Sequence, residues 1–290
     1  MTMSYYILYN PIAGKGNAES EIEALSVFCG GEPIRIDMTK IESYAEFFAP
    51  LAANDAVILC GGDGTLNRFI NDTEGLSIAC ELYYHAIGSG NDFLRDIERT
   101  VNDGPFSIKE YIRDLPTVEV KGKTYRFLNN VGFGIDGYCC EVGDRERGKS
   151  DKPVNYTAIA IKGLLFHYRP CDATVTVDGK EYRYKKAWLA PTMKGRYYGG
   201  GMMATPAQDR NDPEKKLSVL VFYGGGRLRT LMAFPSIFKG EHIKHTKMVK
   251  IHEGQTIHVK FDAPAAVQID GETILGVTEY TATTKVTANV

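Results

Sequence analysis

The clearest indication of the fold is one segment, Ala56-Val57-Ile58-Leu59-Cys60-Gly61-Gly62-Asp63-Gly64-Thr65-Leu66-Asn67. Residues 56–60 form a continuous apolar run, which is typical of a strand buried on both faces of a parallel sheet. Three glycines around one acid follow directly, so the backbone can approach a polyphosphate closely. Asp63 presents a carboxylate that can hold Mg²⁺ or receive the proton of a reacting hydroxyl. A simple glycine turn capped by Asp63 and Thr65 is the alternative interpretation.

Short apolar runs alternate with helix-like segments around this strand. Residues 5–9 and 34–38 read as strands, while residues 18–28 and 43–53 carry apolar side chains at helical spacing. Strand, helix, strand, helix, strand is the pattern of a mostly parallel sheet, in which ligands bind at the carboxyl ends of the strands. We therefore expect a ligand site at the turns that follow these strands.

The pattern changes near residue 116, where alternating apolar and polar runs begin to dominate. Asp178-Gly179 between two such runs indicates a hairpin, and residues 152–167 are the most plausible helix of this part. We predict an α/β domain over residues 1–114 and a mainly β domain over residues 115–290. The runs that predict strands are 117–120, 125–128, 173–177, 182–188, 217–223, 256–261 and 266–269.

Composition excludes several classes of protein. The chain has 290 residues, 43% of them apolar, and 34 Lys and Arg against 36 Asp and Glu give a net charge of −2. A dedicated nucleic-acid binder would need a basic excess. No apolar run approaches the roughly 18 residues that span a bilayer, and the first residues lack the positive region of a signal peptide. The six cysteines form no metal or disulfide pattern, so we expect buried thiols in a reducing, cytoplasmic setting.

Two further glycine-rich turns follow predicted strands. Residues 10–17, Asn-Pro-Ile-Ala-Gly-Lys-Gly-Asn, precede the first helix and are a candidate phosphate cradle, with a merely tight turn as the alternative. Residues 87–95, Ile-Gly-Ser-Gly-Asn-Asp-Phe-Leu-Arg, follow a short apolar segment. There Ser89 and Asn91 can hydrogen-bond a phosphate or a ribose, and Asp92 can contact the ligand or cap the next turn.

Five motifs in combination resemble the diacylglycerol kinase catalytic-domain family, which includes sphingosine kinases and bacterial soluble lipid kinases. They are NPxxGxG at 10–16, GGDGTLN at 61–67, GSGNDFLR at 88–95, NxxGFGID at 129–136 and DGE at 270–272. GGDGT alone also occurs in NAD kinases and the related phosphofructokinase fold, whereas the combination is specific. The resemblance implies an N-terminal α/β nucleotide-binding domain of that kind, a C-terminal β-sandwich-like domain, and an active site in the interdomain cleft.

The resemblance also implies site residues. Asp63 and Glu272 would be the catalytic acids, and which of them accepts the proton of the hydroxyl is left open. Asp136 matches an acid near the head group of the acceptor lipid, and we assign Asn91 and Asp92 to the substrate as well. The residues expected to contact ATP are Asn10, Pro11, Gly14, Thr39, Gly61, Gly62, Asp63, Gly64, Thr65, Asn67 and Ser89.

One departure from the family pattern concerns an accessory Mg²⁺. Bacterial members typically carry P-x-A-x-x-x-D-G-x-L, whose Asp and neighbours hold that ion, whereas residues 206–217 read Pro-Ala-Gln-Asp-Arg-Asn-Asp-Pro-Glu-Lys-Lys-Leu. Lysines replace the expected pair, and Asp212 or Asp209 is the remaining candidate ligand. Mg²⁺ that accompanies ATP is expected independently.

The resemblance predicts transfer of the γ-phosphoryl group from ATP to a lipid hydroxyl, with diacylglycerol as the acceptor and phosphatidic acid as the product. The lipid would be presented at a membrane surface, at its inner face, and a homodimer is expected from bacterial relatives. Residues 239–252 hold four lysines that would dock on an anionic membrane or form a solvated edge. Two alternatives are a soluble-metabolite kinase such as NAD kinase and a catalytically silent nucleotide-binding regulator.

Overall fold

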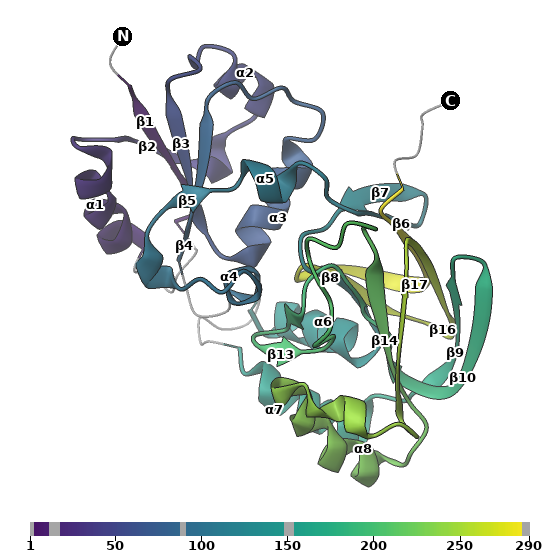
Figure 1. The fold of residues 1–290 in the computed structure, drawn as a ribbon. Coiled ribbons are helices and arrows are strands. Elements are labelled where there is room, and N and C mark those ends of the chain that lie inside the picture. The colour runs from purple at the N-terminus through teal and green to yellow at the C-terminus, as the bar shows by residue number, and fades with distance from the viewer. Residues whose placement is uncertain (1–2, 12–17, 88–90, 148–153, 286–290) are drawn as a thin grey trace. The chain divides into compact units, whose positions relative to one another are not determined.

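The computed structural model describes residues 3–11, 18–87, 91–147 and 154–285 of the chain (Figure 1). It divides into two compact units, Met1–Leu115 and Pro116–Val290. The first unit is α/β and the second is mainly β, so the predicted fold class is confirmed.

The first unit is a five-stranded sheet with helices packed beside it. The strand order is β2-β1-β3-β4-β5, with the first four strands parallel and β5 antiparallel to β4. The strands are β1 (Tyr5–Tyr9), β2 (Ile34–Asp37), β3 (Ala56–Gly61), β4 (Glu81–Ala86) and β5 (Phe106–Ser107). All six residues of β3 are buried, as a central strand covered on both faces requires.

Helices and helical turns connect these strands. They are α1 (Ala18–Cys29), η2 (Met38–Lys40), α2 (Tyr44–Phe48), α3 (Asp63–Asp72), α4 (Asp92–Asp96), η3 (Val101–Asp103) and α5 (Lys109–Ile112). The predicted helix over 43–53 is shorter than expected: Ser43 caps its start, and α2 ends at Phe48, with Ala49 as the C-cap residue and Pro50 directly after it. In α3 the buried residues Leu66, Phe69 and Ile70 recur at helical spacing.

The second unit is a sheet of ten strands that closes on itself. Its order is β7-β6-β17-β16-β8-β11-β14-β10-β9, with β15 beside β14, and β16 also pairs with β9. The strands are β6 (Thr117–Val120), β7 (Lys123–Arg126), β8 (Asn130–Phe133), β9 (Cys171–Val177), β10 (Lys180–Leu189), β11 (Thr192–Met193), β14 (Leu217–Tyr223), β15 (Val249–Gly254), β16 (Thr256–Ile269) and β17 (Glu272–Thr283). A separate small ribbon joins β12 (Tyr197–Tyr198) and β13 (Met202–Met203).

The long strand β16 makes this closure possible. Its first residues, Ile257–Phe261, pair with β9, and its last residues, Val267–Ile269, pair with β8. The register against β17 shifts between Lys260 and Val267, where the strand bends. The two predicted strands 256–261 and 266–269 are therefore one bent strand. Inside the closed sheet the Phe133 and Phe261 rings stack with their centroids 4.0 Å apart.

Helices cover one side of the closed sheet (Figure 1). They are α6 (Ile135–Arg147), α7 (Tyr156–Lys162), the π-helical turn η4 (Gly163–His167), α8 (Arg227–Ala233), η5 (Phe234–Lys239) and η6 (Glu241–Lys244). The predicted helix over 152–167 contains α7 and η4, whereas α6 and α8 were not predicted. Helix α6 lies close against β16, because a Cβ atom at Gly137 would stand 1.9 Å from the Ala266 carbonyl oxygen.

Candidate active site

Most of the predicted nucleotide contacts lie at one edge of the first sheet. Tyr9 is in register with Asp37 and with Cys60, and Gly61 is in register with Ala86, so β1 to β4 end at the same level. Asn10 and Pro11 follow β1, Thr39 follows β2, the Gly61–Asn67 turn and helix start follow β3, and Asn91 and Asp92 follow β4. Gly14 and Ser89 lie outside the described residues.

The first glycine of the β3 turn is held tightly on two sides. The Tyr84 hydroxyl donates a buried hydrogen bond of 2.8 Å to the Gly61 carbonyl oxygen. A Cβ atom at Gly61 would stand 2.4 Å from Cβ of Thr65, so only glycine fits beneath this side chain. A Cβ atom at Gly64 would meet nothing within 4 Å. The segment from the end of β3 to the start of α3 is therefore closely packed at Gly61 and open at Gly64.

Asp63 connects the start of α3 to the start of α4 at this edge. Its Oδ2 atom accepts the backbone N–H of Asp92 at 2.7 Å, and its Oδ1 atom accepts that of Phe93 at 3.4 Å. These N–H groups open helix α4, so the Asp63 carboxylate caps that helix. The side chain that the sequence singled out for chemistry thus also organises the turn after β4. Asp92 itself is buried.

The side chains of Thr39 and Asn67 are engaged within their own elements. The Thr39 backbone N–H and hydroxyl both donate to Oδ1 of Asp37, at 3.0 and 2.6 Å, and the hydroxyl contributes most to lowering the pKa of Asp37. Asn67 is buried on α3, where the side-chain amide of Asn71 donates to the Asn67 side-chain oxygen at 3.3 Å. Thr39 lies at the predicted edge, but a contact with a nucleotide would require its hydroxyl to exchange partners.

In the second unit, Asp136 lies in the first turn of α6 and is buried. Burial raises the pKa of its carboxyl group to about 6, although the N–H of Gly137 and the hydroxyl of Tyr198 lower it in part. A Cβ atom at Gly132 would stand 2.3 Å from Oδ2 of Asp136 and 2.4 Å from the side-chain amide of Gln268. Gly132 thus makes room for a carboxylate and an amide side by side.

Glu272 opens β17 directly after the Asp270-Gly271 hairpin turn, and its side chain is exposed. It lies near α6, because its charge is one of those that raise the pKa of Cys140, after burial and the closer acids of the helix. Asp270, in contrast, is buried and accepts the backbone N–H groups of Leu128, Asn129 and Asn130. Within the DGE motif, the aspartate therefore builds the turn and the glutamate faces solvent.

The buried guanidinium group of Arg210 also holds the loop at residues 128–130. Arg210 donates to the Leu128 carbonyl oxygen at 2.6 Å and to the side-chain oxygen of Asn129 at 2.8 Å. Lys194 is also buried, and burial followed by the charge of Arg210 lowers its pKa. Neither residue was singled out from the sequence, because nothing in the local pattern shows which basic side chains become buried.

The surroundings of Asp212 do not fit a metal ion. Its carboxylate accepts the backbone N–H groups of Glu214 and Lys216, at 3.2 and 2.9 Å. The hydrogen bond from the Lys216 N–H contributes most to lowering the pKa of Asp212, and the nearby charges of Lys216 and Lys194 add to it. Among the described residues no group of three or more His, Cys, Asp or Glu side chains gathers as a cation would require. We therefore derive no step from an accessory metal.

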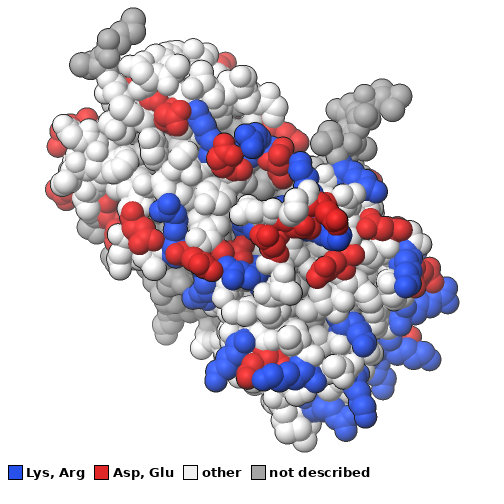
Figure 2. Space-filling view, viewed as in Figure 1, with Lys and Arg blue, Asp and Glu red and all other residues white. Residues whose placement is uncertain are grey.

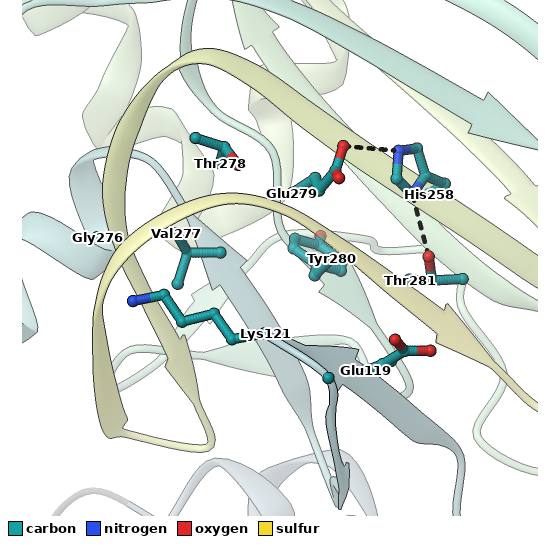
Figure 3. A pocket seen from close by; sticks show the side chains of 10 residues that line it. Glu119, Lys121, His258, Gly276, Val277, Thr278, Glu279, Tyr280 and Thr281 are labelled. Atoms are coloured by element: carbon teal, nitrogen blue, oxygen red, sulfur yellow. Dashed lines mark hydrogen bonds and ion pairs between the residues drawn. The ribbon is translucent and has the colours of Figure 1, made fainter.

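A pocket of about 280 Å³ lies in the second unit between β16, β17 and the β6–β7 hairpin (Figure 3). Several of its polar side chains already have partners: His258 lies 3.7 Å from a carboxylate oxygen of Glu279 and 3.0 Å from the Thr281 hydroxyl, and Lys121 donates to the Leu275 carbonyl oxygen. None of the predicted site residues lines it. We do not assign the chemistry to this pocket.

Comparison with known proteins extends over nearly the whole chain. Residues 4–117 match the diacylglycerol kinase catalytic domain, and residues 129–287 match the YegS C-terminal NAD kinase β-sandwich-like domain. A diacylglycerol kinase of Mycobacterium tuberculosis is 26% identical over 214 residues, which are 71% of this chain and 67% of that protein. A diacylglycerol kinase of Bacillus subtilis is 23% identical over 294 residues, 92% and 91% of the two chains.

A solved structure shares the fold. The crystal structure of a diacylglycerol kinase from Bacillus anthracis superposes with a TM-score of 0.61 at 19% identity, covering 97% of this chain and 93% of that one. Within the residues that the structure describes, every helix is too short or too polar to cross a bilayer.

Proposed function

Because the chain belongs to the diacylglycerol kinase catalytic-domain family, we propose that it transfers the γ-phosphoryl group of ATP to a lipid hydroxyl, with diacylglycerol as the acceptor. The observation that carries the proposal is the shared edge of β1 to β4, where Asn10, the Gly61–Asn67 segment and Asp92 follow successive parallel strands. Such an edge is where α/β sheets bind their ligands.

The nucleotide phosphates would lie against the turns of this edge. The open backbone at Gly64 and the start of α3 offer N–H groups and a helix N-terminus, which favour an anion. Mg²⁺ bound to ATP would supply neutralisation of the β- and γ-phosphate charge. We assign to Asp63 the role of holding the β3 and β4 turns in register around the phosphates, since its carboxylate already accepts two N–H groups of α4.

The acceptor hydroxyl would meet the carboxylates of the second unit. Glu272 is exposed at the start of β17, and we assign it the proton of the attacking hydroxyl. Asp136 is buried at the start of α6, and we assign it a hydrogen bond to the lipid head group. The proton leaves the hydroxyl as its oxygen attacks the γ-phosphorus, the bond from that phosphorus to the bridging oxygen of ADP breaks, and Glu272 carries the proton away.

A single assay tests the proposal. The protein is incubated with γ-labelled ATP, Mg²⁺ and, in separate reactions, diacylglycerol, sphingosine, ceramide, phosphatidylglycerol and NAD. We expect the label in phosphatidic acid. Label in NADP alone would identify a metabolite kinase instead. ATP binding without transfer to any acceptor would identify a nucleotide-binding regulator and would overturn the proposed activity.

A further inference from the structure

Exposed apolar side chains gather on one group of helices in the second unit. Of the thirteen large apolar side chains that are exposed among the described residues, seven belong to the segments 156–166 and 228–243. Phe166, Leu228 and Met232 are the most exposed of these, at 70%, 67% and 69%. The remaining members are Tyr156, Ile161, Phe238 and Ile243. We call these seven residues the apolar face.

The elements that carry the apolar face are packed together. Helix α8 lies against η4 and η5, and η5 lies against η6. The Arg227 guanidinium donates to the Leu164 carbonyl oxygen at 2.8 Å, which ties the start of α8 to η4. Leu228 and Met232 are four residues apart and therefore share one side of α8. Their other side is closed, since Thr230 and Ala233 are buried in the unit.

The same segments concentrate positive charge. Residues 156–169 and 226–247 contain seven Lys and Arg against one acid, Glu241, a net charge of +6 in a chain whose total is −2. We call these seven basic residues the basic rim: Lys162, Arg169, Arg227, Arg229, Lys239, Lys244 and Lys247. The remainder of the chain therefore carries −8. Figure 2 shows blue side chains with little red at the end of the second unit where Figure 1 labels α7 and α8. Glu241 is already paired with Lys244 at 2.8 Å.

We propose that the apolar face and its basic rim form a docking surface for an anionic lipid bilayer. Apolar side chains on short surface helices with a Lys- and Arg-rich border suit the boundary between head groups and acyl chains. A solvated basic edge would not require Phe166, Leu228 and Met232 to be exposed together. A negatively charged leaflet matches both the apolar and the basic part of the surface.

The docking surface adjoins the helix that bears Asp136. Helix α7 and the adjoining η4 pack on α6: a Cβ atom at Gly143 would stand 2.6 Å from the Tyr156 ring, and one at Gly163, the first residue of η4, would stand 2.8 Å from the Tyr138 ring. The rings of Tyr138 and Tyr168 are also in contact, with centroids 5.9 Å apart. On the proposed function, from which this step follows, a docked bilayer would lie one helix away from the head-group site.

Vesicle flotation of the full chain tests the docking surface without any measurement of catalysis. The vesicles contain phosphatidylcholine alone or phosphatidylcholine with 30% phosphatidylglycerol. We expect the protein to float with the anionic vesicles and to be released by high salt. The double variant Leu228→Ser/Met232→Ser should bind at least about tenfold more weakly, because it removes apolar side chains that would enter the interface. The matched control Val27→Ser/Leu275→Ser, at two other exposed apolar positions, should bind as the wild type does.

A charge reversal tests the basic rim separately. Lys239→Glu should weaken binding to anionic vesicles by about fivefold or more, since one charge near such a surface contributes about 1 kcal/mol. Lys123→Glu, an exposed lysine on β7, is the control and should change little. Absence of wild-type flotation, or equal binding by the serine variant and its control, would overturn the proposal. So would conversion of a dimer to a monomer by the serine variant with vesicle binding unchanged, which would make this face a contact between copies.

The docking surface and the proposed activity can fail separately. Phosphorylation of dihexanoylglycerol, which is short enough to dissolve as monomers, requires no membrane. Flotation without phosphorylation of any lipid would retain the docking surface and reject the kinase proposal. Phosphorylation of dihexanoylglycerol without flotation would retain the kinase proposal and reject the docking surface.

Discussion

The Asp63 carboxylate accepts the backbone N–H of Asp92 at 2.7 Å, which joins the start of α3 to the start of α4. The two residues are separated by 29 positions in the chain but lie at the ends of neighbouring parallel strands. One side chain therefore orients two of the turns that we assign to the nucleotide. Asp63 therefore has a positioning role, which can be distinguished by experiment from a second role in which its negative charge takes part in the reaction.

Substitutions of Asp63 should separate these two roles. Asp63→Ala removes the acceptor, so amide exchange at Asp92 and Phe93 should accelerate and kcat should fall about 100-fold or more. Asp63→Asn keeps a side-chain oxygen for the Asp92 N–H, so exchange should stay slow and kcat should fall only about tenfold. Hydrogen-exchange mass spectrometry and the labelled-ATP assay measure the two effects. An Asn variant with slow exchange and activity as low as that of the Ala variant would show that the negative charge itself takes part in the reaction.

Glu272→Gln should affect the reaction and leave the fold intact. The side chain is exposed at the start of β17, so the free energy of unfolding should change by less than about 0.5 kcal/mol. Loss of a proton acceptor should lower kcat by about 10² to 10⁴, with KM for ATP unchanged. Glu181→Gln, at an exposed position on β10, is the matched control. Near-normal turnover of the Glu272 variant would remove this residue from the proton-acceptor role.

The sequence predicts the strands well where an apolar run is long. The runs 5–9 and 56–60 are continuous and apolar, and 217–223 is apolar except for Ser218; each lies within a strand inside its sheet. The tight turn at Gly61 is also predictable, because glycines following an apolar run directly indicate a backbone that leaves no room for a side chain. The Asp178-Gly179 hairpin follows the same logic, with both residues at positive φ.

Long-range contacts could not be predicted from the pattern. Tyr84 holds the Gly61 carbonyl, and Asp270 holds three amides about 140 positions away, but neither residue differs locally from an ordinary strand or turn residue. Helix α6 was missed because its start, Ile135-Asp136-Gly137, contains a helix-weakening glycine. That glycine is there because β16 comes too close for any side chain.

Asp136 should make the stability of the second unit depend on pH. Its folded pKa is about 6, whereas an unfolded aspartate has a pKa of about 3.9. Between these values the folded chain binds a proton that the unfolded chain releases, so stability falls as pH rises from about 4 to about 6 and then levels off. Asp136→Asn has no charge to bury. The variant should therefore be more stable relative to wild type at pH 7.5 than at pH 4.5. The difference between the two free energies of unfolding should shift by about 2 kcal/mol between these pH values.

Trp188 provides the signal for this measurement. It is the only tryptophan of the chain, and it is buried in β10 of the second unit. Urea unfolding followed by its fluorescence therefore reports that unit. Asp262→Asn, at an exposed position of β16, should show no comparable pH difference. A difference between Asp136→Asn and wild type that is the same at both pH values would contradict the raised pKa.

Arg210 should be a main support of the loop before β8. It is buried, and its two hydrogen bonds to Leu128 and Asn129 leave those acceptors without a donor when it is removed. Arg210→Met keeps most of the apolar stem, and it should lower the free energy of unfolding by about 3 kcal/mol. Arg210→Lys should recover less than half of this loss, because an ammonium group cannot reproduce the two-pronged guanidinium contact.

The control for Arg210 is Arg183→Met, since Arg183 is exposed on β10 and paired only at the surface with Glu181. It should change stability by at most about 0.5 kcal/mol.

The same unfolding curves test whether a metal ion binds in the lysine-rich surroundings of Asp212. If buried cations rather than a bound metal hold this region, EDTA should leave the wild-type midpoint unchanged. A midpoint that falls with EDTA and returns with Mg²⁺, together with a small effect of Arg210→Met, would reverse that conclusion, because the loop would then depend on the ion.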